Sequence, residues 1–204
     1  MEIKKFMECM DVAEQMKNRT RHSWTSSGRH ESVAEHSWRL ALMAMFSEDA
    51  FPEADMNKVI RMCLLHDMGE AFTGDIPAFL KTSQDEVREE QVVEKWISSL
   101  PDPWRSDFCA LFQEMEALET QEARIYKALD KLEALIQHNE ADISTWLPLE
   151  YDLQLAYGEK ETEFSDYMKA MRAEANRISL EKIREAEKQA LTKTANAKDA
   201  GESR

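Results

Sequence analysis

Apolar side chains recur along most of the chain at steps of three and four residues, the spacing that places them on one face of an α-helix. Runs in which apolar and polar residues alternate, as they do in strands, are missing, and only five Gly and five Pro interrupt the sequence. The pattern predicts helices over the ranges 3–17, 32–50, 56–71, 83–100, 108–118 and 121–139, and a last one from about residue 161. We therefore expect an all-α fold, a single helical array of about six to eight helices.

The predicted helices have recognisable starts and ends. Ser32 with Glu35, and Ser83 with Glu86, have the capping-box spacing, in which each side chain bonds the backbone N–H of the other residue. The stretches "NRTRHSWTSSGRHE", "FPEAD", "FTGDIP" and "PDPW" contain polar and turn-forming residues and are expected to be loops or turns. The stretch "STWLPLEYDLQLAYGE" is mixed and is expected to hold a short helix and a loop.

Nothing in the sequence divides the helical array into two domains. We find no internal repeat and no interdomain linker, so residues 1–192 are expected to form one domain. The first helix has an apolar stripe of its own, formed by Phe6, Met10, Ala13 and Met16, which should pack against the other helices. Residues 193–204 are small and polar and are expected to form a flexible C-terminal tail.

Composition and charge exclude several classes of partner. The chain has 204 residues, of which 43% are hydrophobic, enough for a core, and its net charge is −14. Such a surface repels duplex nucleic acid and anionic membranes, so neither is an expected partner, and a phosphorylated small molecule would need a local cationic pocket. No stretch approaches the ~20 apolar residues of a membrane span, and the N-terminus lacks the apolar run of a signal peptide.

The cysteines indicate the compartment. Cys9, Cys63 and Cys109 are scattered and have no CxxC spacing. This usage fits reduced thiols in a cytoplasmic protein better than a disulfide framework. A cytoplasmic location is therefore expected.

A few polar side chains interrupt stripes that should face the core. They are His36, the adjacent His66 and Asp67, and Asp130. Buried, unpaired carboxylates are costly, and a divalent cation would remove that cost. Two imidazoles and two carboxylates make a mixed nitrogen and oxygen set, which suits Mn²⁺, Fe²⁺, Co²⁺, Ni²⁺ or Zn²⁺, and the lack of thiolates makes a closed structural zinc site less suitable.

Each of these residues taken singly has a simpler explanation. A lone His on an apolar stripe is more often a satisfied core residue than a ligand, a His-Asp dipeptide is common by chance, and Asp130 is by itself an Asp in a helix. The set of four, in this order, is what indicates a metal centre with coordination positions left for solvent.

The order of His36, then His66 and Asp67, then Asp130 resembles the H…HD…D signature of the HD-domain superfamily of metal-dependent phosphohydrolases. The blocks "ESVAEHS", "LLHDMGEAFTGDIP" and "EARIYKALDKLEALI" resemble those of the bacterial HD-type 5′-deoxynucleotidases and their relatives. The similar region covers about residues 16–139, and the rest of the chain has no detailed match. The resemblance implies one divalent metal ion, for which Mg²⁺ joins the candidates above, held by the four residues of the signature.

The resemblance also implies two catalytic carboxylates. Glu70, three residues after the His-Asp pair, corresponds to the residue that helps to activate water, and its position one helical turn beyond His66 agrees with that role. Asp75 corresponds to a position beside the phosphate, where it would orient the water or protonate the leaving oxygen. The alternatives are a solvated glutamate near a helix end for Glu70 and a turn-forming residue after Gly74 for Asp75.

Substrate contacts are expected from the loop after the first helix and from the "GDIP" block. Arg21 is the expected phosphate ligand, because a guanidinium offers two parallel donors, with Arg19 as the alternative. Trp24 would pack on the sugar or base, or else serve only loop packing. Bacterial members have the Trp directly after the Arg, where this chain has His22, so sugar selectivity is open. Further expected substrate contacts are those of Asp75, Ile76, Pro77, Ala78 and Lys81, although Lys81 would also fit an ordinary solvated lysine; Glu114 or Glu116 is a candidate for the sugar.

Taken together, the resemblance implies a 5′-nucleotidase that releases phosphate from deoxynucleoside or nucleoside 5′-monophosphates, a phosphoric monoester hydrolase, and a homodimer. Two alternatives remain. One is another HD phosphohydrolase activity, on a nucleoside triphosphate, an alarmone or a cyclic nucleotide. The other is a helical module that binds metal or nucleotide without catalysis.

Overall fold

The computed structural model describes the backbone of residues 1–202 and the side chains of residues 1–192. Within the described residues the fold is all-α apart from one short hairpin, as predicted. Ten α-helical segments occur there, of which two, α4 and α9, are four residues long, so that eight longer helices remain. The helices are α1 (Ile3–Asn18), α2 (Val33–Phe46), α3 (Met56–Leu65), α4 (Glu70–Thr73), α5 (Ser83–Ser98), α6 (Trp104–Ala117), α7 (Gln121–Glu140), α8 (Glu150–Ala156), α9 (Glu159–Thr162) and α10 (Asp166–Glu202).

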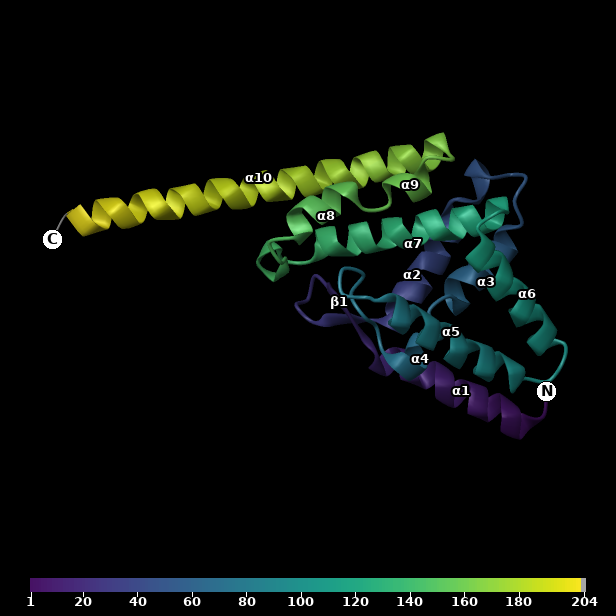
Figure 1. Cartoon of the computed structure of the whole chain (residues 1–204). Helices are drawn as coiled ribbons and strands as arrows, with labels where there is room; N and C mark the ends of the chain where they lie inside the picture. Colours follow the sequence, from purple (N-terminus) through teal and green to yellow (C-terminus); the bar gives the residue numbers. More distant parts are fainter. Residues whose placement is uncertain (203–204) are drawn as a thin grey trace.

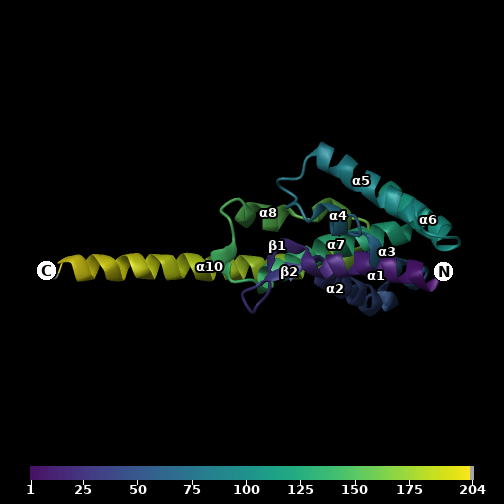
Figure 2. The same cartoon turned by 90° about the horizontal axis from the view of Figure 1, so that it is seen from below.

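Helix α7 is the centre of the domain. It packs against α2, α3, α6 and α10, and most of its side chains from Ala123 to Gln137 are buried. Figure 1 shows α10 running alongside α7 and then projecting beyond the domain, while α5 and α6 lie to one side of the central helices in Figure 2. On a helix that is buried on most faces, unpaired polar side chains are costly. The buried carboxylates of α7 are therefore expected to have partners.

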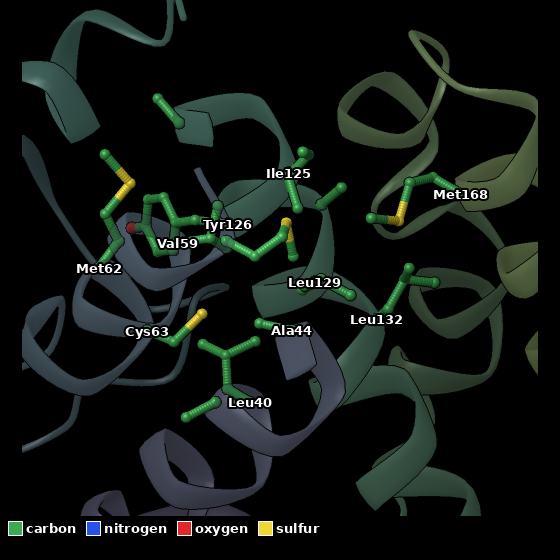
Figure 3. Close-up of a cluster of buried hydrophobic side chains, with 14 of the residues drawn as sticks. Leu40, Ala44, Val59, Met62, Cys63, Ile125, Tyr126, Leu129, Leu132 and Met168 are labelled. Carbon is green, nitrogen blue, oxygen red and sulfur yellow. The ribbon is translucent and has the colours of Figure 1, made fainter. Parts of the chain in front are cut away.

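The main core lies where α2, α3 and α7 meet. Leu40 from α2, Val59 and Met62 from α3, and Leu129 and Leu132 from α7 are fully buried and belong to one cluster (Figure 3). Burying such a side chain is worth roughly 1.5–3 kcal/mol. This packing fixes the relative positions of the three elements that carry the polar residues singled out above.

The segment after α1 is a β-hairpin, which the sequence analysis did not predict. Strands β1 (Thr20–Trp24) and β2 (His30–Ser32) pair antiparallel, and the backbone reverses through Gly28, whose φ is +81°. The side chains of β1 do not alternate between buried and exposed, so the strand lacks the period of two that the analysis relied on. The hairpin is held on α7 by a 2.6 Å hydrogen bond from Nε2 of Gln137 to the carbonyl oxygen of Trp24.

Several element boundaries differ from the prediction. The helix expected over residues 56–71 ends at Leu65, and a tight segment leads to the short helix α4. The helix expected to reach residue 50 ends at Phe46, followed by a 3₁₀ turn at Glu48–Ala50, and the last helix begins at Asp166 rather than near residue 161. In the first helix only Met16 of the predicted stripe is buried, whereas Phe6 and Met10 are exposed.

The two predicted capping boxes had different outcomes. Ser32 and Glu35 form a complete box, with the Ser32 hydroxyl accepting from the Glu35 N–H and the Glu35 carboxylate accepting from the Ser32 N–H. The second box is formed by Thr82 and Asp85, one residue before the predicted pair, because Thr82 and Asp85 meet the same spacing rule and lie at the true helix start. The mixed stretch contains the 3₁₀ turn Ile143–Thr145 and α8, as expected.

Three further predictions concern membrane-spanning helices, the cysteines and the C-terminal tail. No helix in the described part of the chain is long and apolar enough to cross a bilayer. All three cysteines are free thiols. The predicted tail, residues 193–204, lies outside the residues whose side chains are described, so its flexibility and a domain boundary at residue 192 stay predictions.

Candidate metal centre and active site

Side chains from three parts of the chain converge at one point beside the core. His36 lies on α2, His66 and Asp67 follow the end of α3, and Asp130 lies on α7. Nε2 of His36 is 3.3 Å from Oδ1 of Asp130 and 3.8 Å from Oδ2 of Asp67. Nε2 of His66 is 3.0 Å from Oδ2 of Asp67 and 3.7 Å from Oδ1 of Asp130. The structure thus brings together all four residues predicted as metal ligands.

The ligand atoms of this cluster that lack hydrogen-bond partners fit a divalent cation. The Nε2 atoms of His36 and His66 are buried and make no hydrogen bond of acceptable geometry, although carboxylate oxygens lie within 4 Å. His36, His66 and Asp67 each offer a ligand atom, and these atoms lie within 4.8 Å of one another. Two imidazole nitrogens and carboxylate oxygens at such distances are the donor set of a first-row divalent metal site.

The electrostatics of the cluster favour positive charge at its centre. Burial would lower the pKa of His66, but Asp67 and Asp130 outweigh it and raise that pKa to about 10. Burial would raise the pKa of Asp67, but His66 and the neighbouring cations hold that pKa well below its usual range. The carboxylates thus favour positive charge at the centre of the cluster, and a divalent cation would supply it there.

Asp130 is oriented by cations on its other side. Its Oδ2 accepts a 3.1 Å hydrogen bond from Nζ of Lys127, and Nζ of Lys131 lies 3.5 Å away. Oδ1 of the same carboxylate faces His36 and His66. The two lysines thus hold one oxygen of Asp130 and leave the other directed at the centre of the cluster.

Glu70 and Asp75 flank the cluster, and neither is a solvated surface residue. Glu70 is the first residue of α4 and only 6% exposed, and its Oε2 has no hydrogen-bond partner. Burial, together with the carboxylates of Asp67 and Asp75, raises the pKa of Glu70 to about 10. Burial is also the main cause of the raised pKa of Asp75, which follows the left-handed Gly74. A cation beside these groups opposes both shifts.

Arg21 lies against the cluster. On β1, its Nη1 is 3.7 Å from Oδ2 of Asp67 and its Nε is 3.5 Å from Oε2 of Glu31. Burial would lower the pKa of Arg21, but the surrounding carboxylates outweigh it, so the guanidinium keeps its charge. Arg19, the alternative phosphate ligand, instead donates from Nε and Nη2 to the carbonyl oxygen of Ala71 at 3.3 Å each and serves to dock α4.

A cavity opens next to Arg21 and Asp75. The walls combine the predicted Pro77 and Ala78 with residues from β1, α7 and α8, and the lining residues are Arg21, His22, Ser23, Asp75, Pro77, Ala78, Phe79, Ala134, Leu135, His138, Glu150, Leu153, Gln154 and Tyr157. His22, which takes the place of the Trp in the resembled proteins, lies edge-on to Phe79 with ring centroids 5.5 Å apart. The segment after residue 140, which the resemblance in sequence left without a detailed counterpart, therefore forms one wall through α8.

Some predicted substrate residues lie outside this cavity lining. The ring of Trp24 packs against His30 at a tilt of 35°, with ring centroids 4.0 Å apart, and Lys81 is ion-paired with Glu89. Ile76 does not line the cavity, and neither do Glu114 and Glu116; Glu114 is instead paired with Lys58 at 2.7 Å. Contacts of these residues with a substrate stay predictions.

Two buried carboxylates of the site were missed by the sequence analysis. Glu133 contacts Nδ1 of His36 and is fully buried, and Glu31 on β2 is 2% exposed beside Arg21. A signal for Glu133 existed, because it lies three residues after Asp130 on the same face of a predicted helix. Glu31 had none, since its strand was predicted as loop.

The fold and this cluster define a class of protein. It is an all-α domain in which imidazoles and carboxylates from separate helices meet. Beside them lie the guanidinium of Arg21, the carboxyl groups of Glu70 and Asp75, whose pKa values are raised, and a cavity. Such a combination is typical of metal-dependent hydrolytic centres.

The HD domain family is the one whose profile this chain matches, over residues 13–172, and the chain belongs to that family. The 5′-deoxynucleotidase HDDC2 of Xenopus laevis is 33% identical over 138 residues, which are 66% of this chain and 68% of the relative. The 5′-deoxynucleotidase HDDC2 of Mus musculus is 32% identical over 130 residues, 62% of this chain and 64% of the relative. The chain thus spans about two thirds of the length of these relatives.

A solved structure shares the fold. It is described as a predicted metal-dependent phosphohydrolase from Magnetospirillum magnetotacticum and is 29% identical, with a TM-score of 0.73 over 88% of this chain and 91% of the other. The likeness extends past the region that the sequence resemblance covered and includes most of the C-terminal third of the chain.

Proposed function

We propose that this protein is a metal-dependent phosphoric monoester hydrolase that releases phosphate from (deoxy)nucleoside 5′-monophosphates. The observation that carries the proposal is the convergence of His36, His66, Asp67 and Asp130 beside Arg21 and a cavity. The names of the HDDC2 relatives support the substrate class.

The four convergent residues would hold one divalent ion through Nε2 of each His and a carboxylate oxygen of each Asp. Such an ion, when bound, would polarise phosphoryl oxygens and lower the pKa of the attacking water toward neutral pH. The remaining tasks, which are binding the phosphate and moving protons, belong to the side chains of the chain itself.

Arg21 would bind the phosphate. Its guanidinium stays charged despite burial, and its contacts to Asp67 and Glu31, at 3.7 and 3.5 Å, are longer than hydrogen bonds. N–H groups held this loosely remain available for two oxygens of one phosphate. Arg21 therefore supplies the local cationic site that a chain of net charge −14 needs for an anionic substrate.

Glu70 and Asp75 would handle the protons. Glu70, whose buried carboxylate becomes a strong base once it is ionised, accepts the proton of the attacking water. Asp75, which lies beside Arg21 in the cavity lining, would orient this water or donate a proton to the 5′ oxygen as the bond from that oxygen to phosphorus breaks. A new bond forms between phosphorus and the water oxygen, and the products are a nucleoside and inorganic phosphate.

The test is a phosphate-release assay with the full chain, loaded in turn with each candidate metal, on a panel of nucleotides. We expect release from 5′-monophosphates and its loss in Asp67→Ala. Equal release by that variant would refute the assignment of the centre. Product analysis separates the alternatives, because triphosphate, pyrophosphate or a ring-opened monophosphate would indicate another HD chemistry, and tight nucleotide binding without turnover would indicate a non-catalytic module.

We further propose a cytoplasmic homodimer. Free thiols at Cys9, Cys63 and Cys109 are consistent with a reducing compartment. Exposed apolar side chains on the adjoining helices α1 and α2 support self-association, and they include Ile3, Met7, Trp38, Met45 and Phe46. Light scattering of the purified protein tests this, with a mass of twice 23.7 kDa expected.

A further inference from the structure

Both ring nitrogens of His36 face carboxylates, so the side chain has two directions in which it could bind a metal ion. On the Nε2 side lie His66, Asp67 and Asp130. On the other side, Glu31, His36 and Glu133 also place ligand atoms within 4.8 Å of one another, and Nδ1 of His36 contacts Oε2 of Glu133. A neutral imidazole has a lone pair on one ring nitrogen and a proton on the other. His36 can therefore bind a metal ion through Nε2 or through Nδ1, but not through both.

An arginine lies beside each carboxylate on the Nδ1 side. Oε1 of Glu133 accepts a 2.7 Å hydrogen bond from Nε of Arg39, and Nη1 of Arg39 donates to Glu140 at 2.7 Å. Glu31 lies 3.5 Å from Nε of Arg21, and its Oε2 makes no hydrogen bond. A divalent cation placed there would meet two guanidinium groups, whereas on the Nε2 side two imidazole nitrogens make no hydrogen bond of acceptable geometry and face carboxylates. The charges around His36 thus favour a hydrogen-bonded support on the Nδ1 side and a metal ion on the Nε2 side.

We infer that Glu133 is a positioning residue for the metal ligand His36. It accepts the Nδ1–H of His36, which leaves the lone pair of Nε2 directed at Asp67 and Asp130, while Arg39 fixes the other oxygen of Glu133. Both His36 and Glu133 are fully buried, so no water competes for this contact. A carboxylate in this position both selects the tautomer of a ligating His and raises its basicity.

The second imidazole provides an internal comparison. Nδ1 of His66 lies 2.9 Å from the carbonyl oxygen of Cys63, one turn earlier in the chain. His66 is thus oriented by the backbone, which no side-chain substitution removes, and His36 is oriented by a side chain. A substitution at Glu133 should disturb one ligand of the centre and leave the other in place.

Glu133→Gln isolates this role. The amide keeps the size of the side chain but has one acceptor and one donor end, so it can accept from Arg39 or from His36 and not from both. Glu140→Gln is the matched control, because it makes the same substitution on the same helix, contacts the same Arg39, and does not touch His36.

The experiment is zinc titration of metal-free full-length protein against a chelator of known affinity, without nucleotide, with folding checked by circular dichroism. We expect Glu133→Gln to weaken zinc binding by about 10- to 100-fold and Glu140→Gln to change it by less than about twofold. Excess zinc should restore occupancy in Glu133→Gln. Unchanged affinity in a folded Glu133→Gln protein would overturn the inference, as would equal losses in both variants.

A second measurement decides the matter if Glu133→Gln fails to fold. The chain has five His, and the ¹⁵N–¹H correlation spectrum of their rings in zinc-loaded wild-type protein reports which nitrogen of each is protonated. We expect His36 with a proton on Nδ1 and zinc on Nε2, and zinc on Nδ1 of His36 would overturn the inference.

The inference rests on the metal centre of the proposed function but not on its substrate. A protein that binds zinc in this way and hydrolyses no nucleotide would contradict the proposed activity alone.

Discussion

His66 and Asp67 are adjacent in sequence, yet Nε2 of His66 lies 3.0 Å from Oδ2 of Asp67. Within a continuous helix, neighbouring side chains point about 100° apart and do not meet. They lie close here at the end of α3, where the chain continues from Leu65 to Glu70 through tight turns, with the N–H of Met68 bonded to the carbonyl oxygen of Leu65. The same segment leads to Glu70 at the start of α4.

Arg21 and Arg19 should separate substrate binding from stability. Arg21→Lys keeps the charge but loses the paired donors, so we expect KM for a nucleoside 5′-monophosphate to rise roughly 10- to 100-fold, in line with about 1.5–3 kcal/mol for hydrogen bonds to charged groups. Arg19→Lys is the matched control and should leave KM within about twofold, because Arg19 bonds the carbonyl oxygen of Ala71 instead. Steady-state kinetics at saturating metal checks both. A KM increase in Arg19→Lys alone would reverse the assignment.

Glu70 should affect turnover and not metal binding. Glu70→Gln removes the base but no proposed ligand, so we expect kcat to fall by about 10²- to 10⁴-fold, with zinc affinity within a few-fold of wild type. Glu90→Gln, the same substitution at an exposed position on α5, should keep kcat near the wild-type value. Loss of zinc binding in Glu70→Gln would instead make Glu70 a ligand.

Gly69 should be required for the approach of α5 to the centre. A Cβ at this position would lie 2.6 Å from Cγ of Glu89 and 2.9 Å from Cγ2 of Val93. We expect Gly69→Ala to destabilise the protein by about 1–3 kcal/mol, measured as the free energy of unfolding in urea. Adding Val93→Ala should not restore the loss, because it leaves the tighter contact with Glu89. A Gly69→Ala protein as stable as wild type would show that α5 shifts freely.

Glu122 should contribute stability that depends on pH. Its carboxylate accepts a 3.0 Å hydrogen bond from the N–H of Asp55, which together with Lys58 lowers its pKa below the ordinary value of 4.5. Because the folded pKa is the lower one, the contribution is present above pH 4.5 and is lost as the pH falls through the folded pKa.

We therefore expect Glu122→Gln to lower the free energy of unfolding at pH 7 by up to about 1 kcal/mol and the difference from wild type to shrink below pH 4.5. Glu119→Gln, at an exposed position three residues earlier, is the control and should change little at any pH. Urea titrations at several pH values measure this. A difference that grows on acidification would contradict the assignment of the shift.

Long amphipathic helices were predictable from sequence, and short elements were not. The range 121–139 was predicted within one residue of α7, because its apolar spacing persists for five turns. The hairpin at Thr20–Trp24 and His30–Ser32 has too few residues, and too little alternation, for a period of two to show. The break after Leu65 was missed for a related reason, since Val59, Cys63, His66 and Glu70 keep helical spacing across it although the backbone does not.

Some residues of the site could be predicted from the sequence, and others could not. His36, His66, Asp67 and Asp130 are found by sequence because they interrupt apolar stripes, and the structure brings them together. Glu133 shares a helix face with Asp130 and could have been found by its spacing, but its contact with His36 is a tertiary one, and Glu31 lies in a strand that the apolar pattern does not reveal. The wall formed by Glu150 and Gln154 was not predictable from spacing, because it depends on tertiary contacts of α8, such as the 3.0 Å hydrogen bond from Nε2 of Gln154 to the carbonyl oxygen of Leu135 on α7.

The most direct measurement of the central claim is anomalous diffraction from crystals of the full chain grown with Mn²⁺ or Zn²⁺, collected at the absorption edge of the metal. We predict one strong peak within coordination distance, about 2.0–2.2 Å, of Nε2 of His36, Nε2 of His66, and oxygens of Asp67 and Asp130. A peak on the Nδ1 side of His36, or bound metal that contacts fewer than three of these four residues, would contradict it.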